Sequence, residues 1–169
     1  SKIKKKQVKQ YGENPNQKST FYVDETKQGN GLSNCVQLQG KQLSYNNIAD
    51  SDAALECIKG FEEPTCVIIK RANPCGVASD VNITKAYQKA FDADSTSAFG
   101  GIIALNRKLE EKTAQQIIDN QFVEVIIAPE VSSSAKKTLN TKENIRVLEM
   151  KNMEKLSSVL KFLSVTDGL

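Results

Sequence analysis

Three short apolar runs, rich in β-branched residues, constrain the fold of this chain more than any other feature. They occupy residues 66–69, 102–105 and 123–128. Each is continuous rather than alternating, which is typical of strands buried on both faces, as in a parallel sheet. Segments of helical length separate the runs. The sequence therefore predicts an α/β domain of three layers, with helices flanking a mostly parallel sheet.

The segments between the runs carry helical patterns. Ile83, Ala86, Tyr87, Ala90 and Phe91 follow the i, i+3, i+4, i+7, i+8 spacing of an amphipathic helix. Further helices are predicted at about 47–61 (capped by Asn46 or Asn47), 109–121, 132–140 and 153–160. Further strands are predicted at 35–39, 145–148 and, at an edge, 161–165.

Composition excludes several classes of function. The chain has 169 residues and a net charge of +3, from 23 basic and 20 acidic side chains, which is too balanced to indicate nucleic-acid binding. The basic residues 1–9 are interpreted as a solvated end. No apolar run approaches the roughly 20 residues of a membrane span. We expect neither a membrane nor a nucleic-acid partner, and a cytoplasmic location with four reduced cysteines.

The sequence contains no histidine. A Ser-His-Asp or Cys-His arrangement is therefore excluded within this chain, and no zinc site is expected. Any general base must be a carboxylate, a perturbed lysine or cysteine, or a group from another chain or a missing segment.

Two cations, Lys70 and Arg71, end the first apolar run, and residues 73–76 (Asn-Pro-Cys-Gly) are predicted to turn the chain. In open α/β sheets ligands bind beyond the carboxyl ends of the strands. Lys70 is therefore the first candidate for chemistry. A solvated basic loop is the alternative interpretation.

Five motifs occur in an order and spacing that resemble one family. They lie at residues 11–15 (Tyr-Gly-Glu-Asn-Pro), 43–47 (Leu-Ser-Tyr-Asn-Asn), 70–76 (Lys-Arg-Ala-Asn-Pro-Cys-Gly), 97–101 (Ser-Ala-Phe-Gly-Gly) and 122–129 (Phe-Val-Glu-Val-Ile-Ile-Ala-Pro). Together they resemble the formyltransferase domain of the bifunctional AICAR transformylase/IMP cyclohydrolase family. The resemblance covers residues 10–169.

This resemblance implies a cytidine-deaminase-like subdomain, the first of two in the formyltransferase domain. The second subdomain and the cyclohydrolase domain would lie outside this chain, which looks truncated after residue 169. The implied reaction moves a formyl group from 10-formyltetrahydrofolate, a reduced folate co-substrate, to the 5-amino group of AICAR ribonucleotide. The implied enzyme is a cytoplasmic homodimer that requires no metal.

The resemblance also implies catalytic positions. Lys70 matches a lysine that would stabilise the oxyanion or handle a proton. Arg71 stands where the family has its catalytic histidine, and arginine cannot act as a general base. Gln10 stands at the position of a nucleotide-binding arginine, and Asn16 at that of a second histidine.

Five further residues match substrate-binding positions. They are Tyr11, Asn47, Phe99, Gly100 and Glu124. Four of them have a structural alternative that the sequence leaves open: a packed aromatic for Tyr11, a helix cap for Asn47, a turn for Gly100 and an ion pair for Glu124.

Three hypotheses therefore remain at this stage. The chain is the front half of an AICAR formyltransferase and inactive on its own, a nucleotide-binding module without catalysis, or a dimerisation half with a vestigial pocket.

Overall fold

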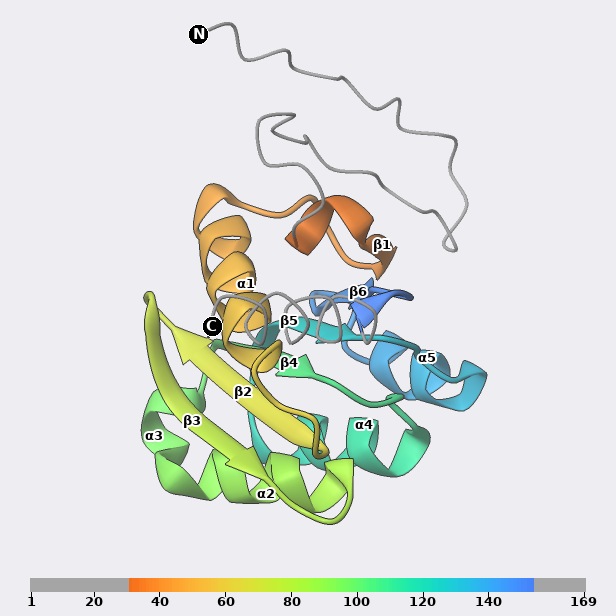
Figure 1. Cartoon of the computed structure of the whole chain (residues 1–169). Coiled ribbons are helices and arrows are strands. Elements are labelled where there is room, and N and C mark those ends of the chain that lie inside the picture. The colour runs from red at the N-terminus through yellow and green to blue at the C-terminus, as the bar shows by residue number, and fades with distance from the viewer. Residues whose placement is uncertain (1–30, 154–169) are drawn as a thin grey trace, which may run out of the picture.

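A computed structural model describes residues 31–153 of the chain. It contains one six-stranded sheet with the strand order β1-β6-β5-β4-β2-β3 (Figure 1). The strands are β1 (Val36–Gln39), β2 (Thr65–Lys70), β3 (Asn73–Ser79), β4 (Gly101–Leu105), β5 (Val123–Ala128) and β6 (Arg146–Glu149). The helices are the 3-10 helix η1 (Gly31–Asn34) and the α-helices α1 (Tyr45–Ile58), α2 (Ile83–Ala93), α3 (Ser95–Ala98), α4 (Glu111–Asn120) and α5 (Ser133–Asn140).

The sheet is mixed, with a parallel centre. β4, β5 and β6 run parallel to one another, and α4 and α5 form the crossovers that parallel neighbours require. β2 runs antiparallel to β4 on one side and to β3 on the other, so β3 points the same way as the parallel centre. β1 closes the opposite edge, antiparallel to β6.

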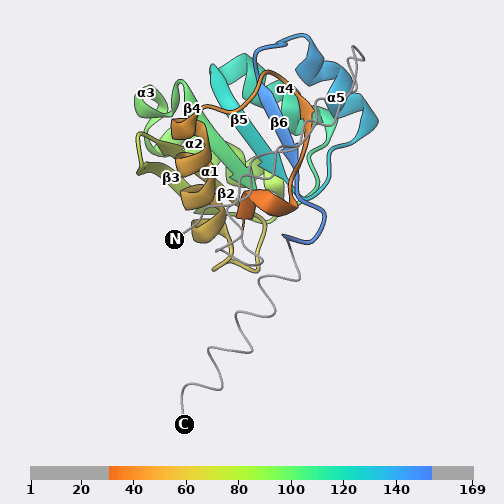
Figure 2. The same ribbon diagram turned by 90° about the horizontal axis from the view of Figure 1, so that it is seen from above.

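Helices cover both faces of the sheet, which confirms the predicted α/β class and its three layers (Figures 1 and 2). Side chains along β2 alternate between the two cores. Cys66 and Ile68 belong to the core that α2, α4 and α5 cover, whereas Val67 and Ile69 belong to the core beneath α1. All four side chains are buried. This two-sided burial explains why the run is apolar throughout.

The predicted helices and strands within the described residues are present, with small shifts at their ends. The run at 123–128 is the whole of β5. The first helix begins two residues earlier than predicted, because Ser44 rather than Asn46 or Asn47 is its N-cap. The Ser44 hydroxyl accepts from the Asn47 backbone N–H, and the Asn47 side chain accepts from the Ser44 N–H. This is a reciprocal capping box.

Two predictions about the first apolar run were wrong. β2 is buried on both faces but is not a parallel strand, since both of its partners are antiparallel. Residues 73–76 do not form the turn either, because they begin β3. The chain turns at Arg71 and Ala72, whose φ angles are +51° and +64°. Lys70 pairs with Asn73 across this two-residue turn.

Several predictions lie outside the described residues. These are Gln10, Tyr11, Asn16, the segment 1–9, and most of the helix and edge strand predicted after residue 153. Among residues 31–153, no helix is both long and apolar enough to span a bilayer.

Candidate functional site

The candidate site lies at the amino ends of β4 and β5. Ile69 pairs with Ile102, and Gly101 pairs with Val123. The end of β2 at Lys70 therefore meets the beginning of β4 and, beyond it, the beginning of β5. The sequence had suggested a crevice at the carboxyl ends of parallel strands. The antiparallel direction of β2 moves the predicted residues to the opposite rim of the sheet.

The Lys70 ammonium is held at this rim by a backbone carbonyl. Its Nζ donates to the Phe99 carbonyl oxygen at 2.6 Å, and the side chain is only partly buried. The next residue, Gly100, has a φ of +78°, a conformation that glycine adopts at little cost. A Cβ placed on Gly100 would lie 4.0 Å from Lys70 Nζ. The backbone of residues 99–100 thus runs directly beside the ammonium group.

The Asn47 amide links α1 to the start of β5. Its Nδ2 donates to Glu124 Oε2 at 2.8 Å while its Oδ1 serves the capping box. Asn47 is 4% exposed. One side chain therefore both caps the helix and orients a carboxylate. The capping alternative for Asn47 is confirmed, and its contact with substrate stays a prediction. Glu124 has an amide partner here, whereas the structural alternative raised for it was an ion pair.

The turn between β2 and β3 is strained and is fixed to α1. A residue other than glycine pays roughly 1–2 kcal/mol for the left-handed conformation, and here two such residues, Arg71 and Ala72, are adjacent. The Ala72 backbone N–H donates to Asp50 Oδ1 at 2.9 Å. Strained turns persist where their surroundings hold them. Asp50 supplies such a restraint, and the Arg71 side chain is exposed at the tip of the turn.

A shallow hollow of about 400 Å³ opens beside Lys70 and Arg71. Cys75 and Asp94 also line it. Burial, followed by the nearby Asp94 charge, raises the pKa of the Cys75 thiol, although Lys70 acts in the opposite direction. Hydrogen bonds from Ser97 lower the pKa of Asp94. Cys75 is therefore a poor nucleophile and Asp94 a weak base at neutral pH.

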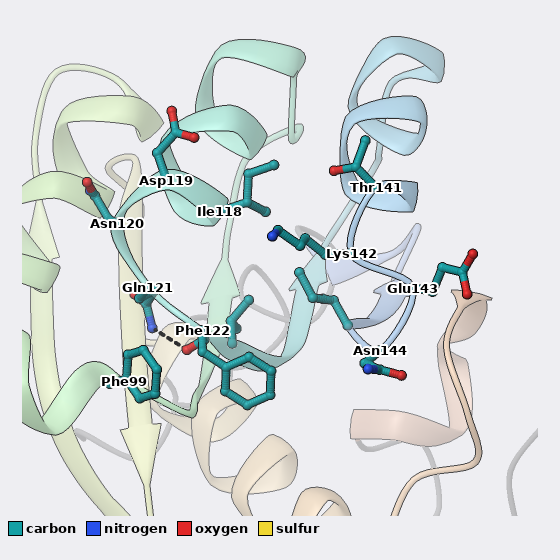
Figure 3. A pocket seen from close by; sticks show the side chains of 12 residues that line it. Phe99, Ile118, Asp119, Asn120, Gln121, Phe122, Thr141, Lys142, Glu143 and Asn144 are labelled. Atoms are coloured by element: carbon teal, nitrogen blue, oxygen red, sulfur yellow. Dashed lines mark hydrogen bonds between the residues drawn. The ribbon is translucent and has the colours of Figure 1, made fainter.

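A larger hollow of about 590 Å³ lies next to the Phe99 segment (Figure 3). Its apolar end is formed by Phe99 and Phe122, which are 57% and 47% exposed. Their ring centroids are 5.8 Å apart. Across the hollow lie polar residues of the loop between α5 and β6, including Lys142 and Asn144. Large exposed aromatic side chains of this kind mark a surface suited to a ligand or partner.

The structure brings the predicted residues together in two groups on neighbouring segments. Lys70 meets Phe99 and Gly100, and Asn47 meets Glu124. The two groups adjoin, because the Gly100 N–H donates to the Phe122 carbonyl at 2.7 Å, two residues before Glu124. Within residues 31–153, no three potential metal-ligating side chains of histidine, cysteine or acidic type come together.

Sequence reasoning missed two residues that support this site. They are Asp50, in the helix predicted at about 47–61, and Gln121, at the end of the helix predicted at 109–121. Their hydrogen bonds reach across 22 residues to Ala72 and 23 residues to Ala98. No local pattern in the sequence signals contacts at such separations.

Comparison with known families identifies the chain. The family described as the AICARFT/IMPCHase bienzyme matches residues 1–169. The chain belongs to this family. Membership in the AICARFT/IMPCHase bienzyme family supports a role in purine biosynthesis.

Among solved structures, the chain is similar to Acinetobacter baumannii RibD, form 2. The identity is 18% and the TM-score 0.46, over 63% of this chain and 35% of that one. The chain thus matches about a third of the length of that structure. At this TM-score the cytidine-deaminase-like character of the AICARFT/IMPCHase chain remains a prediction.

Proposed function

We propose that this chain supplies part of the site that transfers a formyl group from 10-formyltetrahydrofolate to the 5-amino group of AICAR ribonucleotide. One observation carries the proposal. The Lys70 ammonium lies against the backbone of Phe99 and Gly100, beside an open hollow, in a chain of the AICARFT/IMPCHase family. The complete site would include Gln10 and Tyr11, the second subdomain and a second subunit of a cytoplasmic homodimer.

The chemistry requires an electrophilic group and a proton acceptor. The amine of AICAR is a weak nucleophile, because its lone pair is delocalised into the ring and carboxamide. Attack on the formyl carbon produces a tetrahedral oxyanion, and a positioned ammonium stabilises such charge. Lys70 is proposed for this role. Its bond to the Phe99 carbonyl holds the ammonium in place without neutralising its charge.

The remaining groups are proposed to bind the nucleotide. Glu124, oriented by Asn47, would accept hydrogen bonds from the carboxamide of AICAR. The exposed ring of Phe99 and the backbone of Gly100 would lie against the heterocycle, since glycine permits a close approach of backbone to ligand. The Arg71 guanidinium, exposed at the turn, can pair with phosphate or carboxylate but cannot take a proton.

A direct test is a formyl-transfer assay on the complete protein. We expect Lys70→Met to lower kcat at least 100-fold, whereas Lys70→Arg, which keeps a cation, should retain more activity than Lys70→Met. We expect Arg71→His to raise kcat, because histidine can accept the amine proton. An Arg71→His protein that gains nothing would contradict the catalytic role assigned to this position.

A second candidate function is nucleotide binding without catalysis. Two observations favour it: the sequence has no histidine, and the pKa of Asp94, which lines the hollow beside Lys70, is lowered. Isothermal titration calorimetry with AICAR ribonucleotide tests it. Micromolar to millimolar binding without formyl transfer would favour this function, and a protein that does neither would exclude both. Sedimentation would test the homodimer, and with it the third possibility of a purely structural half.

A further inference from the structure

Beneath the candidate site, a buried polar chain connects α2 to the backbone that faces Lys70. The Tyr87 hydroxyl donates to Gln121 Oε1 at 2.9 Å. Gln121 Nε2 donates in turn to the Ala98 carbonyl at 2.6 Å. It also donates, more weakly, to the Phe122 carbonyl at 3.4 Å (Figure 3). Tyr87 is 0% exposed and Gln121 6% exposed. Both side chains are therefore shielded from solvent.

The two carbonyls that Gln121 binds belong to the segments that form the site. Ala98 ends α3 and immediately precedes Phe99 and Gly100, while Phe122 precedes β5. The Phe122 carbonyl also accepts from the Gly100 N–H at 2.7 Å. Three hydrogen bonds thus fix residues 98–100. Gln121 binds the Ala98 carbonyl, Lys70 binds the Phe99 carbonyl, and the Gly100 N–H binds the Phe122 carbonyl.

The orientation of the Gln121 amide follows from its partners. Because both carbonyls can only accept, the NH₂ group must face them and the amide oxygen must face Tyr87. Burial raises the pKa of Tyr87. The hydroxyl therefore remains a proton donor throughout the physiological range, and the amide has only one orientation that satisfies all of its neighbours.

We infer that the Tyr87–Gln121 pair is a positioning element for the nucleotide side of the site: it fixes the Phe99–Gly100 backbone, which sets both the stacking surface for the heterocycle and the anchor of Lys70. Both side chains are buried, so the pair is proposed to act through the backbone of the site rather than directly on the substrate. The inference rests on the proposed formyl-transfer function, and it adds two residues to the machinery of that site.

Replacement of Gln121 by methionine tests this role. Methionine has a similar length but cannot donate to Ala98. We expect the KM for AICAR ribonucleotide to rise at least fivefold in Gln121→Met, while the KM for 10-formyltetrahydrofolate changes less than twofold. We also expect faster hydrogen exchange of the Gly100 amide, measured by nuclear magnetic resonance. A merely structural defect would lower the fraction of active protein and hence apparent kcat, but would leave the KM unchanged.

Gln37 offers a matched control. It is also buried, at 1% exposed, and its Nε2 likewise donates to backbone carbonyls, those of Gln39, Gly40 and Lys41. Gln37 lies in β1, at the edge of the sheet far from β2. We expect Gln37→Met to lose stability comparably but to keep both KM values and the Gly100 exchange rate. An equal rise of the nucleotide KM in both variants would overturn the inference.

Tyr87→Phe is a second, milder variant, which tests the same role if Gln121→Met does not fold. The ring stays in the core and only the hydroxyl is lost, so we expect a smaller change in the same direction: about a twofold rise in the nucleotide KM. An unchanged KM in both Tyr87→Phe and Gln121→Met would refute positioning. A wild-type protein without formyl transfer would overturn the proposed function alone. The inference would then be decided by Gly100 exchange, where equal rates in Gln121→Met and Gln37→Met would overturn it.

Discussion

Replacement of Gly76 by alanine probes how closely β3 lies on α2. Gly76 is a buried residue in the middle of β3. A Cβ at this position would lie 2.0 Å from the Ala90 carbonyl oxygen and 2.8 Å from the Ala90 carbonyl carbon. Optimal contacts are about 3.5 Å, so strand and helix would have to separate by roughly 1.5 Å. The obstacle is helix backbone, which cannot move aside as a side chain does.

The expected loss is at the upper end of the range for overpacked cores, about 3 kcal/mol. β3 is an edge strand, so it can shift outward, and this freedom limits the cost. For a chain of this length, such a loss corresponds to a Tm lower by roughly 6–12 °C. Thermal and urea denaturation followed by circular dichroism measure both quantities.

Gly60→Ala provides the control for this experiment. Gly60 follows α1 and is exposed. The nearest atom that a Cβ there would meet is the Cys57 carbonyl oxygen, at 3.6 Å, an ordinary van der Waals contact. Alanine should therefore raise stability by about 0.4–1 kcal/mol, through the lower entropy of the unfolded chain. If Gly76→Ala were as stable as the wild type, or if both variants lost stability equally, the close packing of β3 on α2 would be refuted.

Three further perturbations have defined outcomes. Asp50→Ala should lower the free energy of unfolding, measured by urea denaturation, by about 1 kcal/mol, because the Ala72 N–H loses its acceptor. Asp50→Asn keeps an acceptor oxygen and should lower it less. Equal losses in the two variants would contradict a stabilising role for the Ala72–Asp50 hydrogen bond. Asn47→Leu breaks the capping box and leaves the Glu124 carboxylate without its amide partner. We expect the free energy of unfolding to fall by about 2–3 kcal/mol. The control variant Asn46→Leu, at an exposed position, should change it little. Burial raises the pKa of Cys35 from 9.0 to about 12. As the pH rises, this thiol therefore ionises in the unfolded chain before it ionises in the folded one. The free energy of unfolding of the wild type should fall between pH 9.0 and about 12, by up to about 1.4 kcal/mol per pH unit from this group. Cys35→Ala should show a shallower loss over the same range, and identical slopes would contradict the assignment.

The sequence predicted the layers of the fold better than the directions of its strands. Continuous apolar runs identify strands buried on both faces, and β5 was predicted residue for residue. An apolar run carries no information about which way its neighbours point, so the antiparallel pairing of β2 was missed. β3 was missed because Pro74 and Gly76 are turn formers, whereas the actual turn uses Arg71 and Ala72, neither of which favours a positive φ.

The candidate site was predictable only where a local motif marked it. Lys70, Phe99 and Gly100 were singled out from their motifs, and the structure places them in contact. Asp50 and Gln121 were not predicted, because each supports backbone that is distant in the sequence. Only the tertiary structure shows such a contact. Their roles follow from bonds to backbone atoms, which any residue type at the receiving position would offer.

The direction of β2 has a practical consequence for labelling the protein. Lys70 lies at the end of the sheet where β4 and β5 begin. The loops that follow these two strands therefore lie at the opposite end of the sheet from Lys70. Lys108 is exposed in one of those loops, where it forms a surface ion pair with Glu130. A fluorophore or affinity handle attached there would report on the protein from a distance of a full strand length, without crowding whatever binds beside Lys70.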